Sequence, residues 1–176
     1  FFMCAAAING CVTLKNMNME SAQGDKEIIS LLKKFGADVT MCGDELTVKK
    51  SILKGIDIDV GDIPDLVPTL SVLACFAEGK TKIYNAARLR IKESDRLLST
   101  SEMIKNLGGK AEITEDTLTV YGNGTLKGGT VDSFNDHRIV MSAAIAASGC
   151  ETEVTITNAQ AVNKSFPDFF EKRKRT

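Results

Sequence analysis

The stretch RLRIKESDRLL, residues 88–98, gathers six ionisable side chains within nine residues and then turns apolar. A serine or an aspartate in its middle can cap a following helix, which would place Arg96 in the first helical turn. Free N–H groups at a helix start attract anions, and a guanidinium offers a fixed fork of donors for carboxylate or phosphate. We therefore predict an anion site here, with Lys92 and Glu93 in the turn before the helix.

Related turns elsewhere in the chain carry further charged side chains. The candidates are Asp65, Asp136, His137, Arg138 and Lys164. Asp136 follows Asp65 at almost the same spacing at which Lys164 follows Lys92. If repeated units bring these turns together, the cations would hold an anionic substrate and the carboxylates would move protons.

Each candidate also has a structural interpretation. Arg96 could belong to an ordinary ion pair, Asp65 could cap the helix after it, and His137 could be a hydrogen-bonded structural residue. Their common position in a repeat favours the functional interpretation over three separate structural ones.

The repeat itself is visible in two segments, LLKKFGADVTMCGDELTVKK (31–50) and MIKNLGGKAEITEDTLTVYG (103–122). A single constant offset aligns Gly36 with Gly108 and the Leu-Thr-Val run at 46–48 with the one at 118–120. A third, incomplete copy opens the chain. We divide the single predicted domain, residues 1–176, into a partial repeat 1–58 and repeats 59–128 and 129–176.

Each unit contains a helix that is apolar on every side and rich in small residues: FFMCAAAI, LVPTLSVLACFA and RIVMSAAIAAS. Such helices must be buried, and Gly10, Gly79 and Gly149 are expected to end them. Alternating strands follow, and amphipathic helices precede Gly36 and Gly108. The predicted fold class is therefore α/β (α+β), a pseudo-threefold domain with buried helices inside and sheets outside.

Composition limits the function classes. The net charge of −1 argues against nucleic acid or an anionic membrane as a partner. Five cysteines without C-x-x-C spacing and one histidine disfavour zinc and fit a reducing compartment. The apolar opening is too short to span a bilayer and has no basic leader. Because the chain opens in mid-pattern, we expect a piece of a longer protein.

The motifs LRIKESDRL and NDHRIVMSAAIAA together resemble the C-terminal signature segments of the 5-enolpyruvylshikimate-3-phosphate (EPSP) synthase family. GDIPDLVPTL, SAQGD and NKSFPDFF resemble further segments in the same order, so the resemblance covers essentially the whole chain. It implies an inside-out α/β barrel of βαβαββ-like units, of enolpyruvyl transferase type. The family's N-terminal domain has no counterpart here.

The resemblance also implies a reaction. The family transfers the carboxyvinyl group of phosphoenolpyruvate to the 5-hydroxyl of shikimate 3-phosphate, releases phosphate, and serves aromatic amino acid biosynthesis in the shikimate pathway. It uses no metal or organic cofactor and is the target of glyphosate. We expect a cytoplasmic enzyme, monomeric at full length, whose missing N-terminal domain is the partner of this chain. The chain alone should be inactive.

Residue roles follow from motif positions only. Asp65 resembles the base for the attacking hydroxyl, and Glu93 the acid at the methylene carbon. Phosphoenolpyruvate contacts would come from Arg96, Arg138 and Lys164. Shikimate 3-phosphate contacts would come from Asp65, Lys92 and Arg88, although Arg88 replaces the Asn of some members. Asp136 and His137 resemble supporting neighbours.

Two alternatives stay open. The first is UDP-N-acetylglucosamine enolpyruvyl transferase, which shares the fold and the donor but fits the paired KESDR and NDHR motifs less well. The second is a non-enzymatic repeat domain that binds RNA ends or protein, which the near-zero charge disfavours.

Overall fold

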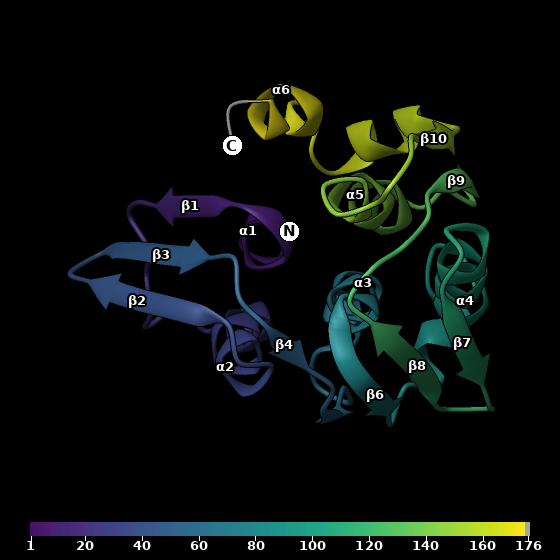
Figure 1. The fold of residues 1–176 in the computed structure, drawn as a ribbon, viewed down its shortest axis with the longest axis horizontal. Helices are drawn as coiled ribbons and strands as arrows, with labels where there is room; N and C mark the ends of the chain where they lie inside the picture. Colours follow the sequence, from purple (N-terminus) through teal and green to yellow (C-terminus); the bar gives the residue numbers. More distant parts are fainter. Residues whose placement is uncertain (175–176) are drawn as a thin grey trace.

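Three apolar helices lie at the centre of the molecule (Figure 1). The computed structural model describes residues 1–174. In it, α1 (Phe2–Asn9), α3 (Val67–Cys75) and α5 (His137–Ala146) contact one another. All nine residues of α3 and nine of the ten in α5 are buried. The predicted burial is confirmed for α3 and α5, as expected for helices that are apolar on all sides. In α1 only Cys4, Ala6, Ala7 and Ile8 are buried, so this helix is covered on part of its surface.

The strands form sheets outside these helices (Figure 1). The first sheet, of order β1-β3-β2, contains β1 (Cys11–Leu14), β2 (Asp38–Cys42) and β3 (Glu45–Lys49). The second, of order β4-β6-β8-β7 with β5 also on β6, contains β4 (Leu53–Lys54), β5 (Asp57–Asp59), β6 (Ala77–Tyr84), β7 (Lys110–Ile113) and β8 (Leu118–Asn123). The third pairs β9 (Gly129–Asp132) with β10 (Val154–Thr157). Helices inside and sheets outside agree with the predicted arrangement.

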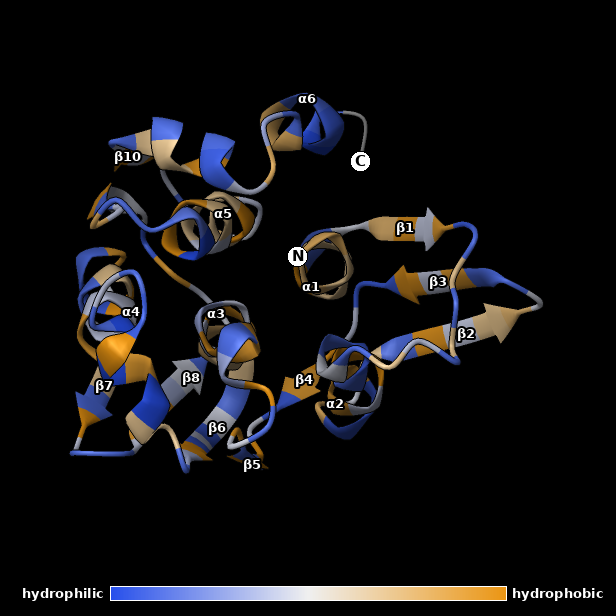
Figure 2. Cartoon of the chain, turned by 180° about the vertical axis from the view of Figure 1, so that it is seen from behind, coloured by the Kyte–Doolittle hydropathy of each residue, from blue (hydrophilic) through white to orange (hydrophobic). Residues whose placement is uncertain are grey.

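Two amphipathic helices complete the core. They are α2 (Ile28–Lys34) and α4 (Arg96–Asn106). The apolar stripes that the spacing predicts are buried: Ile28, Leu31, Leu32 and Phe35 for the first, and Leu97, Ile104 and Leu107 for the second. Figure 2 shows the mixed polar and apolar colouring of α2 beside the more apolar α1. Short 3-10 turns and a last helix form the remaining elements: η1 (Gly24–Glu27), η2 (Pro64–Leu66), η3 (Ala87–Ile91), η4 (Ala159–Lys164) and α6 (Phe169–Arg173). Within residues 1–174, no helix has the length and apolar character needed to cross a bilayer.

Of the three predicted helix stops only Gly10 directly follows its helix, since α5 ends at Ala146, three residues before Gly149. The prediction for the second helix is wrong. Gly79 does not end the second buried helix, because α3 stops at Cys75 and Gly79 lies inside β6. The N–H of Phe76 turns back to the carbonyl of Leu73, and from Ala77 onward the backbone pairs with β4. Strand pairing therefore takes over before the glycine is reached. The φ of Gly79, 92°, is in the left-handed region that glycine tolerates.

The register of the strand pairs repeats along the chain. Leu53 pairs with Ala77 in parallel, and an isolated parallel bridge joins Leu126 to Cys150. Leu126 therefore follows Leu53 by the same number of residues by which Cys150 follows Ala77. The helix–strand–strand order of α2, β2 and β3 also recurs in α4, β7 and β8. This recurrence agrees with the predicted repeat. The boundaries 1–58, 59–128 and 129–176 stay a prediction.

Candidate functional site

The ends of three elements bring most of the predicted charged residues together, Arg88 and Lys164 excepted. The turn from η3 into α4 carries Lys92 and Glu93, and the first turn of α4 carries Arg96. The Asp95 carboxylate caps α4 by accepting from the N–H of Leu98 at 3.1 Å. The other contributions come from η2, which holds Asp65, and from the start of α5, which holds Asp136, His137 and Arg138.

Asp136 is the buried centre of the site. Its side chain is 0% exposed, and it accepts from Nε and Nη2 of Arg96 at 2.7 and 3.2 Å. The hydroxyl of Ser94 donates to it at 3.1 Å, and the backbone N–H of Arg138 donates at 2.9 Å. Both carboxylate oxygens are thus satisfied, and one side chain positions Arg96 while it caps the helix that carries Arg138.

Asp65 contacts three cations. Its Oδ1 lies 2.7 Å from Nη1 of Arg96 and 3.2 Å from Nζ of Lys92. Its Oδ2 lies 3.3 Å from Nη2 of Arg138, whose Nη1 also donates to the Asp65 backbone carbonyl at 2.9 Å. Asp65 does not cap α3, which the sequence left open, because its carboxylate is engaged by these side chains.

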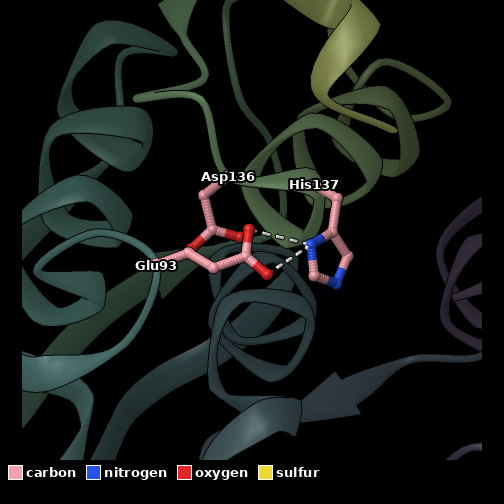
Figure 3. Close-up of side chains that lie close together, drawn as sticks. All are labelled: Glu93, Asp136 and His137. Atoms are coloured by element: carbon pink, nitrogen blue, oxygen red, sulfur yellow. Dashed lines mark hydrogen bonds and ion pairs between the residues drawn. The ribbon is translucent and has the colours of Figure 1, made fainter. Parts of the chain in front are cut away.

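Glu93 and His137 form a hydrogen-bonded pair of titratable side chains beside these two aspartates (Figure 3). Both carboxylate oxygens of Glu93 lie 3.0 Å from Nδ1 of His137. The Glu93 side chain is 36% exposed and that of His137 is 11% exposed, so the imidazole is packed while the carboxylate reaches solvent. Such a pair can position a carboxylic acid for proton transfer.

The two aspartates have lowered pKa values. Burial by itself raises the pKa of Asp136, but the hydrogen bonds and charge of Arg96, with help from Arg138 and Ser94, outweigh burial. For Asp65, burial again raises the pKa, and Arg138, Lys92 and Arg96 together lower it further than burial raises it. Both carboxylates are therefore stabilised in the charged form.

The site is better suited to an anion than to a metal ion. Glu93, Asp136 and His137 have ligand atoms within 4.8 Å of one another. However, both oxygens of Asp136 accept from Arg96, whose guanidinium would repel a cation placed there. The sequence-based expectation of no metal and no cofactor stays a prediction.

Two predicted residues lie apart from this cluster. Lys164, in η4, is exposed and its Nζ donates to the backbone carbonyl of Asn135 at 2.6 Å, one residue before Asp136. Arg88 is exposed on η3, and within residues 1–174 it makes no ion pair with the clustered carboxylates. Their roles stay predictions.

Two residues of the site were not predicted. Ser94 is the serine that the sequence offers only as a possible helix cap, yet its hydroxyl donates to Asp136 and lies 3.0 Å from the hydroxyl of Ser99. Asp25, in the SAQGD segment, lies 4.0 Å from Arg138. The family resemblance of that segment was the only signal that could have suggested Asp25.

Comparisons with known proteins identify the family. The model of the family EPSP synthase (3-phosphoshikimate 1-carboxyvinyltransferase) matches residues 1–173. The chain belongs to the EPSP synthase family. The family predicted from the two signature motifs is therefore confirmed.

Curated members of the EPSP synthase family are close in sequence. The 3-phosphoshikimate 1-carboxyvinyltransferase of Clostridium acetobutylicum is 48% identical over 177 residues, which cover 99% of this chain and 40% of that enzyme. The enzyme of the same name from Methanocaldococcus jannaschii is 45% identical and matches over 95% of this chain and 39% of its own length. The chain thus spans about 40% of the length of the curated relatives it matches.

Solved structures confirm the fold class. An EPSP synthase from Acinetobacter baumannii matches with a TM-score of 0.89 at 33% identity, covering 99% of this chain and 44% of that one. The enolpyruvyl transferase NikO from Streptomyces tendae matches with a TM-score of 0.80 over 99% of this chain and 41% of its own. At 21% identity NikO supports the enolpyruvyl transferase fold alone.

Proposed function

We propose that this chain forms one wall of a cytoplasmic active site that transfers the enolpyruvyl group of phosphoenolpyruvate to the 5-hydroxyl of shikimate 3-phosphate. The observation that carries the proposal is the convergence of Lys92, Arg96 and Arg138 on one carboxylate, beside the Glu93–His137 pair. Family membership supplies the reaction, and the cluster supplies groups suited to it.

The reaction needs proton transfer at two atoms. As the hydroxyl oxygen attacks C2 of phosphoenolpyruvate, it loses its proton to a base, and the methylene carbon gains a proton. The tetrahedral adduct then loses phosphate while one methyl proton returns to a carboxylate base, which restores the carbon–carbon double bond, now in the enol ether product. We assign the first base to Asp65 and the acid at carbon to Glu93, held by His137. Two carboxylates in different environments suit such paired transfers.

Fixed cations would hold the anionic parts of the substrates. Arg96 and Arg138 would contact the phosphoenolpyruvate carboxylate, and Lys164 its phosphate. Lys92, with Arg88, would contact shikimate 3-phosphate. Positive groups held in place before reaction stabilise developing negative charge without reorganisation.

The second wall is assigned to an N-terminal domain. Charges exposed to water interact several times more weakly than charges in a closed, low-dielectric site. Losing even one preorganised donor costs about 10²–10³ in rate. We therefore expect no turnover by this chain alone.

A chimeric enzyme tests the proposal. In the Clostridium acetobutylicum relative, the segment matched at 48% identity is replaced by this chain. Phosphate release is then measured with phosphoenolpyruvate and shikimate 3-phosphate. We expect turnover by the chimera, none by this chain alone, and none by the chimera carrying Glu93→Gln. A folded but inactive chimera beside an active parent would contradict the proposal, as would activity only with the nucleotide sugar UDP-N-acetylglucosamine.

A further inference from the structure

The cations of the site are already neutralised by the chain itself. Arg96 presents one edge, Nε and Nη2, to the buried carboxylate of Asp136. Its remaining nitrogen, Nη1, donates to Asp65, which also contacts Lys92 and Arg138. An anionic ligand could therefore bind these cations only if another cation entered the cluster or if one of the two carboxylates moved away.

Asp65 is the carboxylate that can leave. The side chain of Asp136 is fully buried and accepts from four donors, so its displacement would strand an unpaired charge. The side chain of Asp65 is 34% exposed, and a solvent-borne anion reaches it first. Rotation of this side chain alone would free Nη1 of Arg96 and Nζ of Lys92 without moving the backbone.

The backbone keeps the vacated cations in place. Nη1 of Arg138 donates to the main-chain carbonyl of Asp65, and that contact does not depend on the carboxylate. Arg96 is held through its other edge by Asp136. The guanidinium groups therefore keep their positions when the Asp65 side chain turns away.

We propose that Asp65 is an internal counter-anion, which occupies the anion site until a substrate carboxylate or phosphate displaces it. This inference rests on the proposed function, because it names what happens at the same site when phosphoenolpyruvate arrives. Displacement also removes the contacts with Arg96 and Lys92 from the Asp65 carboxylate. The carboxylate then becomes a stronger proton acceptor when the anion is bound, so substrate binding itself prepares the base.

The test compares the affinity for phosphoenolpyruvate by calorimetric titration of this chain and two variants. Asp65→Asn keeps the side-chain shape but removes the competing charge, and we expect about tenfold tighter binding. The matched control is Asp59→Asn, at an exposed aspartate that accepts from Asn85 and the N–H of Gly61, with expected binding unchanged. A folded Asp65→Asn variant that binds with equal or weaker affinity would overturn the inference.

A second measurement needs no variant. Crystals of the chain soaked with phosphoenolpyruvate should show the ligand on Arg96 and the Asp65 carboxylate more than about 4 Å from Nη1, beyond the limit of an ion pair. A bound ligand with the 2.7 Å Asp65–Arg96 contact intact would overturn the inference. The chimera assay is independent of both results. An inactive chimera would refute the proposed reaction, whereas unchanged affinity of Asp65→Asn beside an active chimera would refute only the counter-anion role.

Discussion

Arg96 and Asp136 form a two-point ion pair between residues far apart in the sequence, with nitrogen–oxygen distances of 2.7 and 3.2 Å. The Arg96 side chain is 3% exposed and the Asp136 side chain is 0% exposed. The pair joins the start of α4 to the start of α5, so the local fold and the candidate anion site depend on the same contact.

Removing the cation of this pair should strongly destabilise the chain. We expect Arg96→Met to lower the free energy of unfolding by about 3–5 kcal/mol, because Asp136 would stay buried and charged without its partner. Urea unfolding followed by circular dichroism measures the change. Adding Asp136→Asn to Arg96→Met should recover part of the loss.

An exposed ion pair provides the control for that experiment. Lys105 and Glu102 lie 3.1 Å apart on the surface of α4, with side chains 48% and 39% exposed. Lys105→Met should change the free energy of unfolding by less than about 1 kcal/mol. An equal decrease in the free energy of unfolding for Arg96→Met and Lys105→Met would show that the buried ion pair stabilises the chain no more than the exposed pair does.

Stability should fall in acid through the two aspartates of the site. Their folded-state pKa values are lowered, so the unfolded chain binds protons first as the pH falls. The stabilisation is fully present above the unfolded pKa of about 3.9 and is lost as the pH falls through the lower folded values. Unfolding free energies measured from neutral pH down into strong acid should show this decline, and Asp136→Asn should flatten it. If the free energy of unfolding of Asp136→Asn falls with pH as steeply as that of the unchanged chain, titratable groups other than Asp136 cause the decline.

His137 should act by positioning Glu93. In the active chimera, His137→Ala should lower kcat by about 10- to 100-fold, because the carboxylate loses its orienting partner. The KM for phosphoenolpyruvate should stay nearly constant, and deuterium incorporation at its methylene carbon should slow in parallel. His137→Asn, whose amide can donate from the place of Nδ1, should restore part of the rate. A variant with unchanged deuterium incorporation would exclude this role.

Gly55 and Gly128, which follow the strand-pairing residues Leu53 and Leu126 by two positions, should both be intolerant of a side chain. A Cβ on Gly55 would collide with the backbone of Lys80, and a Cβ on Gly128 would lie 2.6 Å from the carbonyl oxygen of Thr152. Gly55→Ala and Gly128→Ala should each cost about 1–3 kcal/mol in unfolding free energy. Gly61→Ala is the control, since its nearest contact would be a side-chain oxygen at 3.4 Å. Full stability of either variant would contradict the close backbone approach at that glycine.

The sequence by itself determined the elements and their repetition. The all-apolar segments, the Leu97–Ile104–Leu107 stripe and the match of Gly36 with Gly108 predicted the buried helices and repeated units that the structure contains. These features depend on local periodicity and on burial of apolar surface, which residue types express directly. The failure at Gly79 shows the limit, since pairing of Ala77 with a distant strand ended the helix first.

Only the tertiary structure decided how the charged residues are paired. Motif positions indicated Asp65, Arg96 and Asp136 as site residues. The sequence could not show that the buried Asp136 accepts from Nε of Arg96 while Asp65 accepts from its Nη1. It also could not show that Arg88 lies exposed on η3. The pairing depends on which helix ends the packed core brings within about 3 Å of each other, the range of a hydrogen bond. It also depends on which carboxylate the packing buries away from water.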